Sequence, residues 1–242
     1  MKKVWFVFFA PLLVFLWTGC ASAGKAALLS QHDTIALVSV AANQDINWLN
    51  EDSTDPGTAG PFVKRALRAN PDNAIVSNAG DLMNRAEAII RENMGSTGVI
   101  NLADKDTVLN SRAYQEARIN KYQINQEMVK PGDYQFIDYR DKNFPPALAA
   151  ETGIQRSMFV EFNFTKSMAT GAGKFGTCRA NVTMNVLILD AQGKTLYRTT
   201  VSLSSGSTIK VSNGVYSQSG MTGLFESAIT DACYEFLDNL AN

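Results

Sequence analysis

Histidine and cysteine are scarce in this 242-residue chain, which has one histidine, His32, and three cysteines. A histidine-rich metal site is therefore excluded, and no two cysteines have the C-x-x-C spacing of zinc or redox motifs. A Ser-His-Asp triad would have to use His32, which precedes the first expected strand. An excess of one charge is also missing, because 22 basic and 23 acidic residues give a pI near 5.9. This balance gives no electrostatic basis for binding nucleic acid.

An apolar run occupies positions 4–17, where 14 residues are interrupted only by Pro11. The run is too short for a comfortable membrane span, and it follows Lys2 and Lys3 as the core of a signal peptide does. We therefore expect the chain to be exported. The expected organisation is a signal peptide at residues 1–19, a tether at 20–32, which is lipidated if the resemblance described next holds, and a single domain at 33–242.

Residues 16–22, with the sequence LWTGCAS, resemble the bacterial lipobox, in which a small residue precedes a cysteine that is acylated and becomes the mature N-terminus. The sequence departs from that pattern at Trp17, where the family has leucine. The resemblance implies that Cys20 is lipidated and that the source is bacterial. Ala21 after the cysteine favours the periplasmic side of the outer membrane. The alternative is ordinary signal cleavage at the A-S-A sequence of residues 21–23, which would discard Cys20.

Cys178 and Cys233 remain once Cys20 is lipidated or removed. Disulfides persist in oxidising compartments, so an even pair of cysteines in an exported chain is compatible with a bond between them. Two buried free thiols fit the sequence equally well, because free cysteine behaves as a small hydrophobic residue. Both alternatives stay open on the sequence alone.

The clearest pattern in the sequence lies between residues 158 and 205. Alternate residues of a strand face opposite sides of a sheet. Every second residue from Val182 to Ile188 is apolar, whereas the residues between them are polar up to Asn185. Gly193 then provides the turn before a return segment rich in β-branched residues. The pattern predicts a strand followed by a β-hairpin with one face buried throughout.

Two main helices are predicted at residues 77–94 and 222–240, where apolar residues recur at helical spacing. Ser77 or Asn78 would cap the first helix, and Gly95 would end it. The other expected elements are strands at 33–42, 98–102 and 134–139, helices at 61–69, 104–117 and 145–152, and a loop at 206–220. We therefore expect an α/β (α+β) fold, with a mixed β-sheet and a C-terminal β-hairpin covered by the two main helices.

This order of elements, with an "LxLxDxxGKxLY" pattern across the hairpin, resembles the periplasmic α/β domains of certain bacterial lipoproteins. They are the lipoproteins related to the curli secretion lipoprotein and to the penicillin-binding-protein activators. The residues that carry the resemblance are 34–40, 147–164, 186–197 and 224–240. A long polar insertion at 43–76 departs from the family. No pair of amphipathic membrane hairpins is evident, which argues against a pore.

Two sequence patterns that suggest chemistry have simpler explanations. Gly171 to Gly176 match G-x-G-x-x-G, but a dinucleotide site requires a helix next, and here a strand is expected. We therefore expect no cofactor. Carboxylate pairs, namely Asp104 with Asp106 and Asp138 with Asp141, would bind a cation weakly, and solvated charge is the ordinary interpretation of such pairs.

Two classes of function remain after these exclusions. The first is a non-enzymatic, lipid-anchored envelope protein that binds a protein partner or assembles with itself. The second is a periplasmic hydrolase or carbohydrate-processing enzyme that uses carboxylates. A deep pocket with convergent carboxylates would favour the enzyme. A shallow surface with exposed aromatic residues would favour the binding protein, with Trp48, Tyr134 and Tyr139 as candidates for the partner surface.

Overall fold

The computed structural model describes residues 34–49, 79–172 and 175–241. Several features expected from the sequence lie outside these ranges and stay predictions: the signal peptide and tether, Cys20, His32, the short helix at 61–69 and the caps Ser77 and Asn78.

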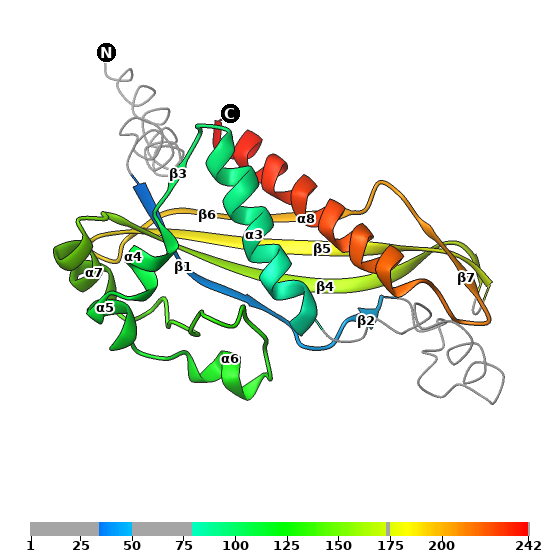
Figure 1. The fold of residues 1–242 in the computed structure, drawn as a ribbon, viewed down its shortest axis with the longest axis horizontal. Helices are drawn as coiled ribbons and strands as arrows, with labels where there is room; N and C mark the ends of the chain where they lie inside the picture. Colours follow the sequence, from blue (N-terminus) through cyan, green and yellow to red (C-terminus); the bar gives the residue numbers. More distant parts are fainter. Residues whose placement is uncertain (1–33, 50–78, 173–174, 242) are drawn as a thin grey trace, which may run out of the picture.

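The described strands form one mixed sheet with the order β3-β1-β4-β5-β6 (Figure 1). β1 runs parallel to β3 and β4, whereas β4, β5 and β6 are antiparallel neighbours. β2 pairs with β4, and β7 pairs with β5. The strands are β1 (Thr34–Ala42), β2 (Asn47–Trp48), β3 (Asn101–Leu102), β4 (Arg156–Ala172), β5 (Phe175–Asp190), β6 (Thr195–Ser204) and β7 (Ile209–Ser212).

The expected burial pattern of the hairpin is confirmed. From Val182 to Ile188 every second side chain of β5 is buried, while Asn185 on the other face is exposed. Further along β5, Leu187 is buried too, so the strand is covered on both faces there. At the turn, Gly193 has a φ of 74°, and the Asp190 carboxylate accepts hydrogen bonds from two turn amides.

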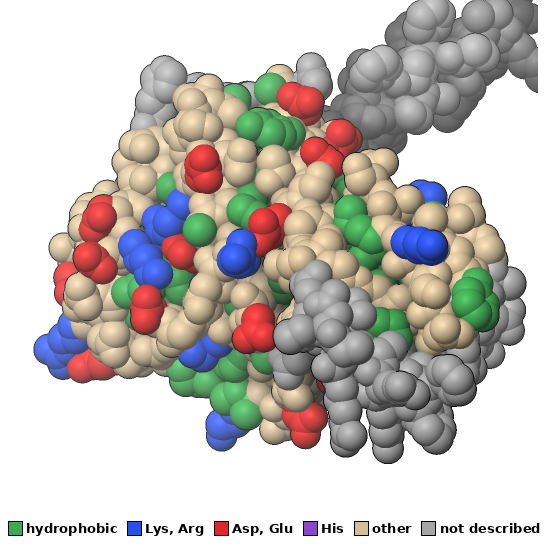
Figure 2. All heavy atoms as spheres, turned by 45° about the vertical axis from the view of Figure 1, so that its right-hand side comes forward, with side chains coloured by type: hydrophobic (Ala, Val, Ile, Leu, Met, Phe, Trp, Pro, Cys, Tyr) green, Lys and Arg blue, Asp and Glu red, His purple; other side chains and the backbone are tan. Residues whose placement is uncertain are grey.

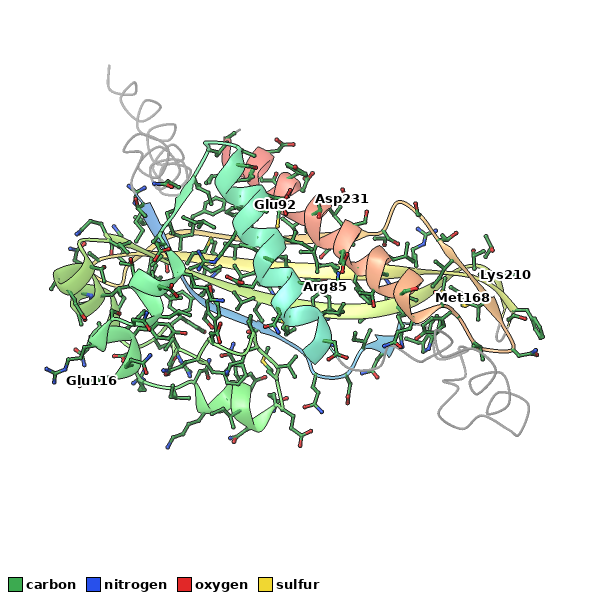
Figure 3. All side chains as sticks on the ribbon, in the orientation of Figure 1. Arg85, Glu92, Glu116, Met168, Lys210 and Asp231 are labelled. Atoms are coloured by element: carbon green, nitrogen blue, oxygen red, sulfur yellow. The ribbon has the colours of Figure 1, made fainter. Side chains whose placement is uncertain are left out.

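Two long helices lie side by side on one face of the sheet, as predicted (Figure 1). They are α3 (Gly80–Ser96) and α8 (Gln218–Ala241). Phe225 of α8 packs edge-on against Phe164 of β4, with ring centroids 5.5 Å apart. Arg85 of α3, labelled in Figure 3, forms an ion pair with Glu226 of α8. None of the helices in the described ranges combines the length and apolar character needed to cross a bilayer.

The shorter helices belong to the chain between β3 and β4, which packs beside β1. They are α4 (Lys105–Leu109), α5 (Arg112–Gln115), α6 (Lys121–Asn125) and α7 (Phe144–Thr152). The single helix expected over 104–117 is therefore two. Asp104 and Ser111 each cap a new start by accepting a hydrogen bond from a backbone amide. The helix expected at 145–152 is confirmed, and Gly153 ends it with a φ of 76°.

Two expectations for loops and strands are wrong. Residues 134–139 do not form a strand, because their backbone groups bond elsewhere: the Gln135 amide donates to the Tyr114 hydroxyl at 2.7 Å, and the Asp138 amide donates to the Arg118 carbonyl at 2.8 Å. Ile137 makes only an isolated bridge with Ile119. The segment expected to be a loop after β6 instead contains β7 and the first turn of α8.

Candidate functional site

The sheet face opposite α3 and α8 is polar over most of β4, β5 and β6. Its side chains are exposed or half-buried and are mostly Asn, Ser and Thr. Cross-strand hydrogen bonds link them, as between Thr200 and Asn185 at 2.7 Å and between Ser204 and Asn181 at 2.7 Å. Apart from the end near Phe159 and Leu187, where it is covered, this face has no apolar core over the described part of these strands, so it is the natural place for contact with another molecule.

A groove of about 390 Å³ opens where this face meets the chain that follows α6. We call it the Tyr139 groove. Its floor consists of two rows of cross-strand neighbours on β4, β5 and β6. One row is Phe159, Leu187 and Arg198, and the next row is Glu161, Asn185 and Thr200. Its wall is formed by Gln123, Ile137 and Tyr139.

Asp138 fixes the wall beside Tyr139. Its buried carboxylate pairs with Arg118 and with Arg140, each at 3.0 Å. Burial opposes the charged form of Asp138, but hydrogen bonds from Arg140 and the charge of Arg118 lower the pKa of its carboxyl. Asp138 therefore stays ionised at neutral pH and holds both arginines in place.

Tyr139 is the exposed aromatic residue of the groove, with 42% of its surface accessible. Its ring packs edge-on against Phe159, with centroids 6.4 Å apart. The guanidinium groups of Arg140 and Arg198 lie 5.7 Å and 6.0 Å from the centre of the ring. The ring is therefore oriented by contacts from both the wall and the floor.

Charged groups of both signs reach the groove without neutralising each other. Arg198 forms no ion pair with any residue that the structure describes. Glu161 accepts a hydrogen bond from Gln123 Nε2 at 3.1 Å, while the buried Gln123 Oε1 has no partner among the described atoms. Arg198 and Glu161 come from strands two apart and from different rows of the floor, which places their backbones roughly 12 Å apart.

The sequence did not single out Arg198, Glu161 or Gln123. Each lies in a different part of the chain, and only the register of three strands and the fold of the wall bring them together. The alternation of polar residues up to Asn185 did indicate a face that is not buried in the core. That signal located the face, but it did not locate the groove.

Among the aromatic residues that the sequence proposed for a partner surface, Tyr139 is in the groove and Trp48 is not. Trp48 is half-buried and pairs through β2 with Lys166 of β4. Its ring packs edge-on against Tyr216 at 6.2 Å, and Lys166 Nζ lies 5.3 Å from its centre. These contacts attach the segment that carries Trp48 to the body of the domain.

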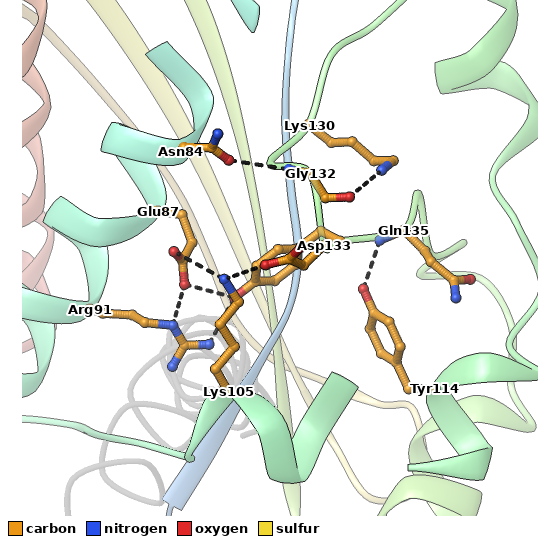
Figure 4. A network of polar contacts seen from close by, with 10 residues as sticks. Asn84, Glu87, Arg91, Lys105, Tyr114, Lys130, Gly132, Asp133 and Gln135 are labelled. Atoms are coloured by element: carbon orange, nitrogen blue, oxygen red, sulfur yellow. Dashed lines mark hydrogen bonds and ion pairs between the residues drawn. The ribbon is translucent and has the colours of Figure 1, made fainter. Parts of the chain in front are cut away.

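Tyr134 is 1% exposed, so the expectation that it contributes to a partner surface is wrong. Its hydroxyl accepts a hydrogen bond from Arg91 at 2.8 Å and donates one to Glu87 at 3.2 Å. Lys105 lies 3.6 Å from the Glu87 carboxylate and 3.2 Å from Asp133 (Figure 4). Burial raises the pKa of Tyr134. This network joins α3 and α4 to the chain at 130–135.

Cys178 and Cys233 are both buried and both free. The structure therefore agrees with the second alternative left open by the sequence, two packed thiols without a bond. Burial raises the pKa of the Cys178 thiol to about 11 and that of Cys233 to about 12. Neither thiol is suited to act as a nucleophile at neutral pH.

The carboxylate pairs noted in the sequence have structural partners. Asp104 caps α4 by accepting from the Thr107 amide at 2.9 Å, a bond that lowers the pKa of Asp104. Asp141 accepts from the amides of Arg118 and Asn143, each at 3.1 Å. Among the residues described, no cluster of three or more His, Cys, Asp or Glu side chains has the arrangement of a metal site.

A second cavity, of about 410 Å³, lies at the start of β1 near α4 and α7. Its one carboxylate, Asp104, is the α4 cap, and its other lining residues carry no charge. On the side of the molecule shown in Figure 2, Lys and Arg side chains are mixed with Asp and Glu rather than gathered by sign. The Tyr139 groove is therefore the better candidate site.

No protein-family model matches this sequence, and no characterised protein matches it in a sequence comparison. Among solved structures, it is similar to the LpoB C-terminal domain from Salmonella enterica, at 11% identity and a TM-score of 0.29, over 77% of this chain and 97% of that one. It is also similar to the lipoprotein GNA1162 from Neisseria meningitidis, at 14% identity and a TM-score of 0.28, over 84% and 99% of the two chains. Both TM-scores are below 0.5, so neither likeness indicates a function.

Proposed function

We propose that this chain is a non-enzymatic envelope protein, anchored by a lipid on Cys20, that binds a protein partner at the periplasmic surface of the membrane through the Tyr139 groove. The observation that carries the proposal is Arg198, a cation without an ion pair in the described structure, set beside the exposed ring of Tyr139. Arginine and tyrosine are enriched at the energetic centres of protein interfaces. The polar face around the groove supplies the rim of such an interface.

The alternative function, a hydrolase that uses carboxylates, finds little support in the same groove. Glycosidases of the common type need two carboxyl groups within roughly 5–10 Å of each other, one acting as acid and the other as base or nucleophile. Glu161 is the one carboxylate that lines the groove, and Asp104 is the one that lines the second cavity. Neither lining therefore has the two convergent carboxylates that would favour an enzyme.

The test is capture of the lipidated protein from detergent-solubilised envelope, with quantification of the proteins that are retained. Arg198→Glu reverses the unpaired charge in the groove and is expected to reduce retention of the specific partner at least tenfold. Lys121→Glu makes the same charge change on the exposed surface of α6 and serves as the matched control. Equal retention by Arg198→Glu and wild type would contradict the proposed binding site.

A further inference from the structure

The two edges of the sheet are protected very differently. On the β1 side, β3 pairs with the beginning of the strand, and Val129 pairs with Ala42 at its end through two hydrogen bonds of 2.9 Å. On the other side, β6 is the last strand of the sheet, and no described residue pairs with its outer edge. Since both termini of β1 are covered, β6 is the long edge left for another chain.

The register identifies which backbone groups face outward from β6. The Ser205 amide donates to the Ala180 carbonyl at 2.8 Å, which fixes the hydrogen-bonded positions of the β5–β6 ladder. Since these alternate in an antiparallel pair, residues 199, 201 and 203 bond to β5. The amides and carbonyls of Arg198, Thr200, Ser202 and Ser204 then point away from the sheet. All four of these residues are exposed.

Apart from a bulge at Leu196 near its start, β6 has few of the devices that usually protect an edge strand. Natural edges are kept from pairing by charges, proline, bulges, short length or a covering segment. β6 has ten residues, no proline, and Arg198 as its one charged residue, and its register is continuous from Tyr197 to Ser204. An exposed strand of this kind is a template for strand addition.

The charges beside this edge differ between its two faces. α8, which packs on β5 and β6, contains four carboxylates and no lysine or arginine. Glu226 faces Arg85 on α3. Successive residues of an α-helix are about 100° apart around its axis, so Asp231 and Glu235 lie roughly 140° and 180° around α8 from Glu226. They are therefore on the side of α8 turned away from α3 and toward β6, and Figure 3 marks Asp231 there.

Neither Asp231 nor Glu235 forms an ion pair with the described residues; Glu235 accepts a hydrogen bond from Asn239 at 3.2 Å. The α8 side of the β6 edge is thus acidic. The opposite side carries Arg198 and neutral Ser and Thr residues. A strand added to β6 would place alternate side chains on these two faces.

We propose that β6 binds an extended segment of a protein partner as an additional antiparallel strand, with lysine or arginine side chains on the face turned to α8 and neutral or acidic side chains on the face beside Arg198. The inference rests on the proposed function, since it takes the bound molecule to be a protein. Backbone hydrogen bonds to the outward groups of β6 give the attachment, and the charges on the two faces give selectivity.

A second copy of this chain fits the edge less well. Pairing of β6 with β6 about a two-fold axis would bring both acidic α8 flanks to the same junction, and like charges placed together oppose association. The partner strand must therefore bring the basic residues. Self-association is kept as one outcome of the test.

The test uses the full mature chain with Cys20→Ser and a fluorescent, capped peptide of alternating threonine and lysine, followed by fluorescence anisotropy. A second peptide carries N-methyl groups on its threonines, the residues whose amides would face β6. A third has glutamate in place of lysine. The first peptide is expected to bind, and the other two at least tenfold more weakly.

Variants of the protein separate backbone pairing from general attraction. Thr200→Pro removes one outward amide that the β5 ladder does not use, and it is expected to weaken binding of the threonine-lysine peptide at least tenfold. Thr200→Val keeps that amide and is the matched control. Asp231→Asn with Glu235→Gln is expected to weaken binding and to reduce its dependence on salt. If Thr200→Pro proves unfolded, the N-methylated peptide still makes the comparison with the wild-type protein.

Three results would overturn the inference: no binding of the threonine-lysine peptide, equal binding of the N-methylated peptide, or concentration-dependent self-association of the chain through β6. Envelope capture separates this inference from the proposed function. A partner lost with Arg198→Glu but retained with Thr200→Pro leaves the function standing and rejects strand addition. A partner retained by both variants rejects the groove and the edge together.

Discussion

The hydroxyl of Tyr134 donates a hydrogen bond to the buried carboxylate of Glu87 at 3.2 Å. A residue from a stretch without regular structure is thereby bonded to the middle of α3. Arg91 bonds to the same hydroxyl at 2.8 Å and to the Ala103 carbonyl at 3.0 Å. The contact explains how the chain between β3 and α7, which carries the wall of the Tyr139 groove, is attached to the helices.

Tyr134→Phe is expected to lower the free energy of unfolding by about 1–3 kcal/mol, because Glu87 and Arg91, two charged groups, each lose the hydrogen bond that they make with the buried hydroxyl. Tyr122→Phe removes a hydroxyl from a side chain that is 65% exposed and should change stability little. Urea unfolding of the two variants makes the comparison. Equal stability of both variants and wild type would show that the buried network contributes nothing.

Gly171 and Gly176 face each other near the end of the β4–β5 hairpin, where a side chain has no room. A Cβ on Gly171 would lie 2.2 Å from the Phe175 carbonyl oxygen, and one on Gly176 would lie 2.0 Å from that of Thr170. Both glycines also have positive φ values, 83° and 147°. Each alanine substitution is expected to destabilise the protein by at least about 1 kcal/mol.

Gly95 in α3 is the matched control for these substitutions, since a Cβ added there would have no neighbouring atom within 4 Å and the residue has no positive φ. Gly95→Ala is expected to stabilise the protein by up to about 1 kcal/mol through helix propensity. Thermal unfolding of the three variants should therefore give shifts of opposite sign. A gain in stability from Gly171→Ala would contradict the close approach of the two strands.

The sheet and its two long helices were predictable because their burial patterns are local. Val182 to Ile188 alternate within one strand, and the apolar stripe of α8 repeats at helical spacing, so each element carries its own signal. The second half of β4 and all of β7 were less visible. Residues 169–172 and 209–212 are held by pairing with β5 rather than by an apolar pattern of their own.

The groove was not predictable, because its residues carry no shared local signal. Tyr134 and Tyr139 are five residues apart in one irregular segment, yet one is buried against Glu87 and the other is exposed beside Arg198. Hydrogen bonds to residues distant in the sequence, such as that of the Gln135 amide with Tyr114, decide which way each ring turns. A local sequence pattern does not indicate such contacts between distant residues.

Native thiol labelling is expected to be slow at pH 8, because Cys178 and Cys233 are buried and their thiols are protonated at that pH. After denaturation without reductant, both should be labelled, and mass mapping should find no disulfide-linked peptide. The mature protein isolated from the envelope is the proper sample, since export exposes it to oxidation. A bonded peptide pair would contradict the two free thiols.

Lipidation of Cys20 remains a prediction from the sequence alone. The mature protein is expected to begin with an acylated Cys20 and to enter the detergent phase on phase separation. Cys20→Ser should abolish the acyl mass and move the protein to the aqueous phase or leave the precursor unprocessed. A mature N-terminus at Gly24, found by mass spectrometry, would instead support ordinary cleavage at residues 21–23.

Stability should fall at alkaline pH in a way that depends on the two cysteines. Burial raises the pKa of Cys178 to about 11 and that of Cys233 to about 12, against 9.0 for the unperturbed thiol. The unfolded chain therefore releases these protons at lower pH than the folded chain does. Their contribution to stability is complete below pH 9 and is lost as the pH rises through 11 and 12.

Cys178→Ala combined with Cys233→Ala removes this contribution and should flatten the decline of the unfolding free energy between pH 9 and 12, although the double variant starts from a lower value because it loses buried volume. Tyr114, whose pKa burial raises to about 12, titrates in both proteins and does not affect the difference between them. Urea unfolding at a series of pH values gives the two curves. Both side chains are 0% exposed, so we expect the thiol pKa values to differ between the folded and unfolded chains. Parallel curves would mean that the pKa values are the same in both and would contradict this prediction.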